Sequence, residues 1–99
     1  MEKIFNNDTF QKFKTYLVQQ DMITDYLWSS KIITERQYQE IKSCTTDMAK
    51  AEYFWLLMKQ GRPYLEAVKK ALIETEQKEI ADLLEYPSRC VLFQFYNIN

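Results

Sequence analysis

The sequence of 99 residues contains no histidine, one glycine and only two prolines. Without histidine, the chain lacks the side chain that most often serves as a general base, a metal ligand or the activator of a catalytic nucleophile. One glycine is too few for the glycine-rich loops that bind phosphate groups in nucleotide-binding proteins. So few turn-forming residues also argue against a β-sandwich or a β-barrel, and they favour long helices with few breaks.

Long apolar segments and a large net charge are missing as well. No apolar run approaches the length of a membrane span, and no secretory signal is recognisable at the N-terminus. The net charge of −1 provides no general attraction to nucleic acids or to membranes. Cys44 and Cys90 lie far apart and lack the spacing of metal ligands. We therefore expect free thiols, a cytoplasmic protein, and no metal ion or cofactor.

The remaining composition is that of one globular domain. Apolar residues make up 46% of the chain and aromatic residues 15%, which is enough to bury a single core without a metal ion or a disulfide. We expect this domain to span residues 8–86. The tail, residues 87–99, contains the apolar run CVLFQFY, which is prone to aggregate. This tail either packs back on the domain, remains flexible, binds a partner, or begins a part that this chain lacks.

Capping residues predict where the helices begin and end. Thr34 is followed by Gln37 at the spacing of a capping box, which predicts the start of the third helix. Gly61 is expected to follow the fourth helix, Pro63 to lie in the first turn of the fifth, and Pro87 to stop the sixth. The N-caps expected for the other helices are Asp8 or Thr9 for the first, Asp21 for the second, and Thr46 or Asp47 for the fourth.

Apolar residues recur at helical spacing along six segments. In the fourth segment Tyr53, Trp55 and Leu56 widen the apolar surface beyond one stripe, which is typical of a helix that is central in a bundle or has a partner. Six short helices with short connections predict an all-α fold, a compact antiparallel bundle rather than a coiled coil. The residues expected to face the core are Phe10, Phe13, Leu17, Ile23, Tyr26, Leu27, Tyr38, Ile41, Ala51, Phe54, Leu57, Met58, Leu65, Val68, Ala71, Leu72, Ile80, Leu83 and Leu84, and Val18 is a further candidate.

Groups that could carry chemistry or bind nucleic acid are few. Cys44 lacks a base that could activate it, and the acids of residues 74–85 lie on a charged stretch typical of a solvated helix face, where catalytic pKa shifts are not expected. Trp28 and Trp55 could stack on nucleobases, but no basic stripe lies between them, so we expect them in the core or at an interface. The sequence therefore predicts neither an enzyme nor a nucleic-acid-binding protein.

Charge is instead distributed unevenly along the chain. Residues 21–46 carry four acids and three bases, residues 47–72 carry three acids and five bases, and residues 74–85 carry five acids and one base. An acidic patch and a basic patch on one small domain can dock on the opposite patches of a second copy or of a related domain. An ordinary mixed surface is the alternative.

Three segments carry a resemblance to a known family: DYLWSSKIITERQYQEI, TTDMAKAEYFWLLMKQG and YLEAVKKALIETEQKEIADLLE. The chain resembles a caspase recruitment domain (CARD), a member of the death-fold superfamily, and is most similar to the prodomains of initiator caspases. The resemblance covers roughly residues 8–86. The residues that match the family pattern most closely are Ala71, Leu72, Glu74, Thr75, Gln77, Ile80, Ala81, Leu83 and Leu84.

The resemblance implies a six-helix Greek-key bundle whose first helix is often kinked, and a function in binding rather than catalysis. Such domains pair or stack with their own kind and bring caspases, kinases or adaptors together. We therefore expect CARD-containing partners (a caspase, an adaptor or a nucleotide-binding sensor), assembly into a homo-oligomer or filament, and a role in apoptotic or innate-immune signalling. The alternative is a structural or regulatory helical subunit that oligomerises without CARD partners.

The resemblance also implies which surfaces bind. In this family a basic surface from helices one and four commonly meets an acidic surface from helices two and three. Lys14 matches the basic position of helix one, and Asp25 matches the acidic position of helix two. Lys50 is a position on helix four, but if the register shifts, Glu52 occupies a site that is often basic. The predicted basic face is Lys12, Lys14, Lys50, Lys59 and Arg62, and the predicted acidic face is Asp25, Glu35 and Glu40.

Overall fold

The computed structural model describes residues 5–84, and every regular element among them is a helix. The prediction of an all-α, six-helix bundle is confirmed. The predicted tail, residues 87–99, lies outside the described residues, and so do Pro87 and Cys90. The helices are α1 (Asn7–Tyr16), α2 (Gln20–Ser29), α3 (Glu35–Lys42), α4 (Asp47–Lys59), α5 (Arg62–Glu74) and α6 (Lys78–Leu83).

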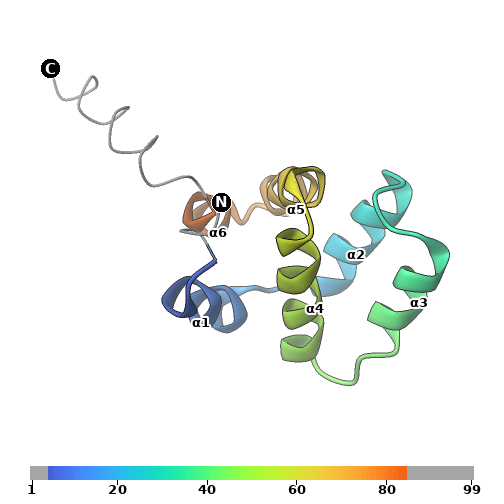
Figure 1. The fold of residues 1–99 in the computed structure, drawn as a ribbon, viewed down its shortest axis with the longest axis horizontal. Coiled ribbons are helices and arrows are strands. Elements are labelled where there is room, and N and C mark those ends of the chain that lie inside the picture. Colours follow the sequence, from blue (N-terminus) through green and yellow to red (C-terminus); the bar gives the residue numbers. More distant parts are fainter. Residues whose placement is uncertain (1–4, 85–99) are drawn as a thin grey trace, which may run out of the picture.

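Helices α4 and α5 form the centre of the molecule (Figure 1). Helix α4 packs against α1, α2, α3 and α5, and α5 packs against α2, α4 and α6. Helices α1 and α6, which are far apart in sequence, also pack against each other. They lie on one side of α4 and α5, whereas α2 and α3 lie on the other side. The two sides of the bundle are therefore built from different segments of the chain.

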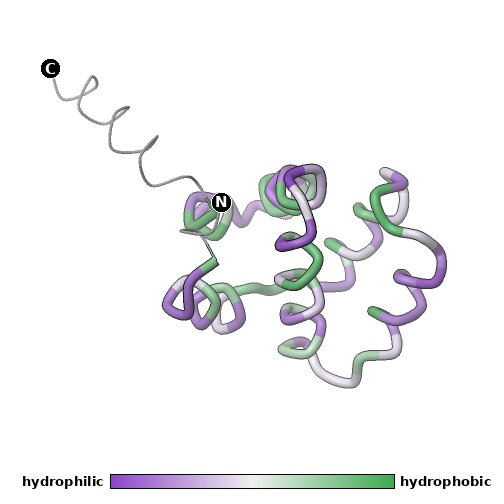
Figure 2. The backbone as a smooth tube through the Cα atoms, viewed as in Figure 1, coloured by the Kyte–Doolittle hydropathy of each residue, from purple (hydrophilic) through white to green (hydrophobic). Residues whose placement is uncertain are grey.

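One apolar core fills the space between these helices. Most of the predicted core positions are buried, while Phe10, Tyr26 and Tyr38 pack against the core from its edge. Val18 is exposed and Leu83 is only half-buried, so these two predictions are wrong. Figure 2 shows apolar and polar segments alternating along the helices, as expected when each helix buries one side. The buried apolar residues are Phe13, Leu17, Ile23, Leu27, Ile33, Ile41, Ala51, Phe54, Trp55, Leu57, Met58, Leu65, Ala67, Val68, Ala71, Leu72, Ile80, Ala81 and Leu84.

Trp55 lies in an aromatic cluster that joins α1 to α4. Its ring centroid is 5.2 Å from that of Phe5, 5.1 Å from that of Phe10 and 5.5 Å from that of Phe13. Aromatic pairs at such distances stabilise a fold beyond the area that they bury. Helix α1 runs from Asn7 to Tyr16 without interruption. The widened apolar surface of α4 thus reflects a central position, although Leu56 stays 60% exposed.

Three predictions about helix starts are confirmed. The Thr34 hydroxyl accepts a hydrogen bond from the Gln37 backbone N–H (3.2 Å), and the Gln37 side chain accepts one from the Thr34 N–H (2.8 Å), which completes a capping box. Thr46 caps α4 by accepting a hydrogen bond from the N–H of Ala49. Pro63 lies in the first turn of α5. The two threonines satisfy N–H groups that have no partner within their own helix.

Two predicted N-caps are wrong. Asn6, rather than Asp8 or Thr9, caps α1, because its side chain accepts a hydrogen bond from the Thr9 N–H (2.8 Å). Asp21 does not cap α2. The N-cap is Gln19, and Asp21 lies within the first turn of the helix. The Asp21 carboxylate contacts lysine side chains of two other helices instead.

Residues other than glycine occupy the left-handed backbone positions of this fold. Gly61 follows the last turn of α4 as predicted, but its backbone is extended at φ 167°. The left-handed positions are Gln19 at φ 58°, Lys31 at φ 61° and Glu76 at φ 62°. Lys31 and Glu76 follow the ends of α2 and α5, where glycine is the usual residue. Residues with long polar side chains thus adopt the left-handed conformation that glycine usually provides, and the one glycine of the chain does not.

Gln77 joins the α1–α2 connection to the α5–α6 connection. Its side-chain amide accepts a hydrogen bond from the Val18 N–H (3.0 Å) and donates to the Val18 carbonyl (2.8 Å) and to the Thr75 hydroxyl (2.8 Å). Gln77 is 6% exposed, so water competes little for these bonds. Gln19 adds a hydrogen bond to the Thr75 carbonyl (3.3 Å). Together these bonds hold the start of α6 near the end of α1.

We predict that Gln77→Met lowers the free energy of unfolding by about 1–3 kcal/mol, because the partly buried N–H and C=O of Val18 lose their partner while the side-chain volume is nearly kept. Urea denaturation followed by circular dichroism measures the change. Glu74→Ala is the matched control, since Glu74 is exposed and its replacement should change stability by less than about 0.5 kcal/mol. Equal stability of wild type and Gln77→Met would contradict this role of the amide.

Candidate interaction surfaces

Lys14, the predicted basic residue of α1, already has partners within the molecule. Its Nζ lies 3.4 Å from Oε2 of Glu52 on α4 and 4.2 Å from the centroid of the Phe10 ring. The side chain bridges two packed helices and is only 13% exposed. A partner protein that needs this ammonium group would have to compete with the Glu52 carboxylate.

Lys50, the predicted basic residue of α4, is equally covered. Its side chain is 13% exposed, and its Nζ lies 3.0 Å from Oδ1 of Asp21 in the first turn of α2. The same carboxylate oxygen lies 3.7 Å from Nζ of Lys42 on α3. Asp21 therefore connects α2 to both α3 and α4.

The other predicted bases differ in whether they form ion pairs within the chain. Lys12 pairs with Asp8 at 3.2 Å and Arg62 pairs with Glu66 at 3.6 Å, each within one helix. Such exposed pairs contribute little to stability and exchange readily. Lys59 is exposed and makes no ion pair with another residue in the range 5–84. Four of the five predicted bases thus contact an acid of the same chain, and the five do not form one free cationic surface.

Asp25, the predicted acidic residue of α2, is well exposed. Its side chain is 61% accessible and lies 3.5 Å from Nζ of Lys42. It also accepts a hydrogen bond from the Tyr38 hydroxyl at 3.3 Å. Both partners belong to α3, so Asp25 helps to hold α3 against α2 while remaining open to solvent.

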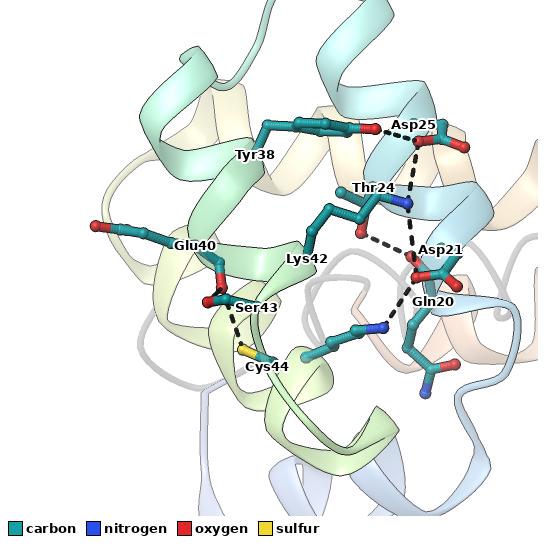
Figure 3. A network of polar contacts seen from close by, with 10 residues as sticks. Gln20, Asp21, Thr24, Asp25, Tyr38, Glu40, Lys42, Ser43 and Cys44 are labelled. Atoms are coloured by element: carbon teal, nitrogen blue, oxygen red, sulfur yellow. Dashed lines mark hydrogen bonds and ion pairs between the residues drawn. The ribbon is translucent and has the colours of Figure 1, made fainter.

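Glu40 and Glu35 occupy other parts of α3. In Figure 3 the Glu40 side chain points away from Asp25. Its carboxylate accepts a short hydrogen bond from the Tyr53 hydroxyl (2.6 Å) and lies 3.5 Å from Arg36. Glu35, in the first turn of α3, is exposed, and no ion pair joins it to the described part of the chain. Glu35 and Glu40 line one open hollow on α3, whereas Asp25 lies on α2 and is not part of it.

Lys42 is the centre of a polar network that the sequence analysis missed (Figure 3). Its ammonium lies 3.7 Å from Asp21, 3.5 Å from Asp25 and 5.4 Å from the centroid of the Tyr38 ring. With Lys50, the network contains two acids and two bases, so it is nearly neutral. Asp21 and Asp25 are four residues apart on α2, a spacing that signals a shared side of one helix. The ion pairs that these acids form with Lys42 of α3 and Lys50 of α4 cannot be predicted from spacing within one helix.

The network also shifts protonation equilibria. A hydrogen bond from Lys50 and the positive charge of Lys42 lower the pKa of Asp21 below its ordinary value of 3.8. The hydrogen bond to Asp21 raises the pKa of Lys50. Burial and the hydrogen bond to Glu40 raise the pKa of Tyr53 to about 12. All three shifts favour the form that each group already has at neutral pH.

Large apolar side chains also reach the surface beside these charges. Trp28 is 39% exposed and stacks on Tyr38, with ring centroids 5.1 Å apart and ring planes 28° apart. Leu56 lies on α4 between Glu52 and Lys59 and is 60% exposed. Apolar anchors surrounded by polar groups are typical of protein interfaces. The other exposed large apolar residues are Tyr16, Val18, Met22, Met48 and Ile73.

The remaining surface features are modest. Cys44 is half-buried and not in a disulfide, and its thiol donates to the Glu40 carbonyl at 3.5 Å. A hollow of about 180 Å³ lies between the α2–α3 connection and α5, and Tyr26, Ile32 and Pro63 are among its lining residues. None of the helices within residues 5–84 has the length and apolarity needed to cross a membrane.

Comparison with known proteins identifies one family. The family model of the caspase recruitment domain matches residues 6–86, a range that includes all six helices. Searches among curated proteins and among solved structures found no match. The Greek-key bundle of the death fold, which the sequence analysis expected, is the architecture of this family.

The pKa of Asp21 provides a test of the network. Lys50→Met should raise it toward the ordinary value of 3.8, because Lys50 is the largest cause of its lowering. An NMR titration of the Asp21 carboxyl carbon measures the change, with Lys12→Met as the control, because Lys12 pairs with Asp8 instead. The ionised carboxylate stabilises the fold above pH 3.8, and this contribution is lost as the pH falls through the lower pKa of the folded state. An unchanged pKa in Lys50→Met would show that the pair is not maintained in solution.

Tyr53 provides a second test, at alkaline pH. The unfolded chain loses this phenolic proton near the ordinary pKa of 10, whereas the folded chain keeps it up to about 12. Stability that is present below pH 10 should therefore be lost as the pH rises toward 12. Urea denaturation at several pH values should reveal a smaller alkaline loss in Tyr53→Phe than in wild type. Identical losses in the two proteins would rule out the raised pKa.

Proposed function

The chain belongs to the caspase recruitment domain family, and on this basis we propose that it recruits or regulates a caspase or an adaptor by binding other caspase recruitment domains. Members of this family are protein interaction domains rather than catalytic ones. We further propose that the partner is a caspase or the adaptor of one, because the three sequence segments resemble initiator-caspase prodomains. We place this activity in the cytoplasm, in apoptotic or innate-immune signalling.

The arrangement of charge on the two sides of the bundle carries this proposal. Lys14 lies on α1 and Asp25 on α2, and these helices lie on opposite sides of α4 and α5 (Figure 1). A module with complementary charges on opposite sides can bind one neighbour with each side, which permits chains or helical assemblies. We propose that Lys12, Lys14, Lys59 and Arg62 contribute to the basic side and that Asp25, Glu35 and Glu40 contribute to the acidic side. Lys50 was also predicted for the basic side, but its ammonium contacts Asp21 of α2, so it lies beside the acids instead.

Internal pairing limits how strongly any one contact can bind. Lys14 and Lys50 must give up or share Glu52 and Asp21 before they bind a partner's acids. An exposed ion pair contributes only about 0–1 kcal/mol, and an exchange of one pair for another contributes less. Lys59 and Glu35 need no such exchange with a described residue, so they are the charges best placed to steer a first encounter. Stable binding would then come from apolar contacts and from the repetition of weak contacts in an assembly.

Charge reversal at each side tests the proposal. Lys14→Glu and Asp25→Lys should each weaken binding to purified initiator-caspase CARDs by about tenfold, because like charges would then face each other. Pull-down at low and high salt measures the loss, and circular dichroism verifies that the helices are intact. Lys70→Glu is the control, since Lys70 is exposed on α5 and belongs to neither proposed side.

Mixing the two variants separates direct contact from damage to the fold. If the two sides meet, Lys14→Glu and Asp25→Lys should bind each other better than either binds itself. Failure of every reversal to alter binding, with the fold intact, would exclude these sides as interfaces. A chain that self-associates but binds no CARD would instead favour a structural subunit.

A further inference from the structure

Trp28 is exposed but held in a fixed position. It exposes 39% of its surface, whereas tryptophan is largely buried in most proteins. One face of its indole stacks on the Tyr38 ring of α3, with centroids 5.1 Å apart. This contact orients the indole near the C-terminal end of α2 without burying it. A rigid aromatic ring that remains accessible is a typical anchor for a partner protein.

Asp25 adjoins this aromatic pair. It precedes Trp28 by three residues on α2, so the two side chains share one side of the helix. The Tyr38 hydroxyl donates to Oδ1 of Asp25 at 3.3 Å, while the ring of the same residue stacks on Trp28. Tyr38 therefore joins a carboxylate and an indole into one surface, which we call the Asp25–Trp28–Tyr38 patch.

Lys42 of the same domain already contacts this patch. Its Nζ lies 3.5 Å from Oδ1 of Asp25 and 5.4 Å from the centroid of the Tyr38 ring. Lys42 and Tyr38 both contact Oδ1 of a carboxylate that is 61% exposed, so Oδ2 remains as an acceptor for an outside group. Among the described residues, no cation lies over the Trp28 ring.

We propose that the Asp25–Trp28–Tyr38 patch binds an arginine side chain of a partner domain, an inference that rests on the proposed function. A planar guanidinium can stack on an aromatic ring and at the same time donate its N–H groups to a carboxylate. Lysine presents a compact ammonium that lacks the planar fork. The patch therefore selects partners that place arginine, rather than any base, against α2.

Other occupants fit this surface less well. An apolar side chain would remove water from Asp25 without replacing the lost hydrogen bonds, which is costly for a charged group. An acidic side chain would be repelled by the same carboxylate. A neutral polar side chain could accept the ring contact but would gain nothing from the charge.

Short peptides test the chemistry of the patch directly. We would titrate nitrogen-15-labelled protein with capped Gly-Gly-Arg-Gly-Gly and follow the indole N–H of Trp28 by NMR. Peptides with lysine or citrulline at the centre are the controls, because citrulline keeps the planar shape of arginine without its charge. The arginine peptide should bind about threefold more tightly than the lysine peptide, and the citrulline peptide most weakly. The indole signal of Trp55 should not move, since that residue is 4% exposed.

The Asp25→Asn variant tests the carboxylate. It keeps an oxygen that can accept the Tyr38 hydrogen bond, so the ring pair should persist. The preference for arginine over citrulline should shrink, because only the attraction of the cation to the rings remains. Equal affinities of the three peptides for wild type would overturn the proposal. Full retention of the arginine preference in Asp25→Asn would overturn it as well.

Binding of whole domains separates this inference from the proposed function. Trp28→Leu should weaken binding to initiator-caspase CARDs by at least about tenfold, whereas Ile73→Ala, a change at an exposed apolar residue of α5, should not. If wild type and Trp28→Leu bind these domains equally well, the proposed function stands and the arginine patch is overturned. If no CARD binds while the peptides behave as expected, the patch stands and the proposed function fails.

Discussion

The enclosure of α4 is the constraint on which the rest of the structure depends. Four other helices pack against it, and its buried residues include Ala51, Phe54, Trp55 and Met58. A helix covered on so many sides has few places for charged residues. Lys50 lies where α4 meets α2, and Glu52 lies where α4 meets α1. Charged groups at such edges are within reach of the neighbouring helix, so ion pairs between helices follow directly from the packing of the core.

This constraint explains why the proposed binding sides are nearly neutral in the free chain. The groups that would face a partner first serve to hold α1, α2 and α3 around α4. Binding through them is therefore an exchange of contacts, which suits weak and salt-sensitive recognition. Trp28 and Tyr38 supply what the ion pairs do not, because a stacked aromatic surface gains from contact without giving up an internal salt bridge. We therefore propose that recognition by this domain depends on rings as much as on charges.

Local patterns in the sequence were sufficient to predict the helices but not the site. The number of helices, most of the core and the Thr34 capping box depend on residues within one or two turns of each other, and these predictions are confirmed. The pair of Asp21 and Lys50 spans 29 positions and depends on how α2 packs against α4. The start of α1 at Asn6 was missed because several nearby residues are equally good caps. Contacts between helices, rather than properties of one helix, account for most of what the sequence concealed.

The ion pairs between helices have a consequence for how such a domain can diverge. In each pair, replacement of one partner by a neutral residue exposes the charge of the other and leaves the apolar core unchanged. Loss of the Glu52 carboxylate would leave Lys14 without its ion pair, whereas loss of the Lys50 ammonium would leave Asp21 paired with Lys42 alone. A single mutation can thus convert a neutral region of the surface into a charged one that attracts a partner of opposite charge. Related domains that share this core can therefore differ in the charges that they present to a partner through one substitution at a time.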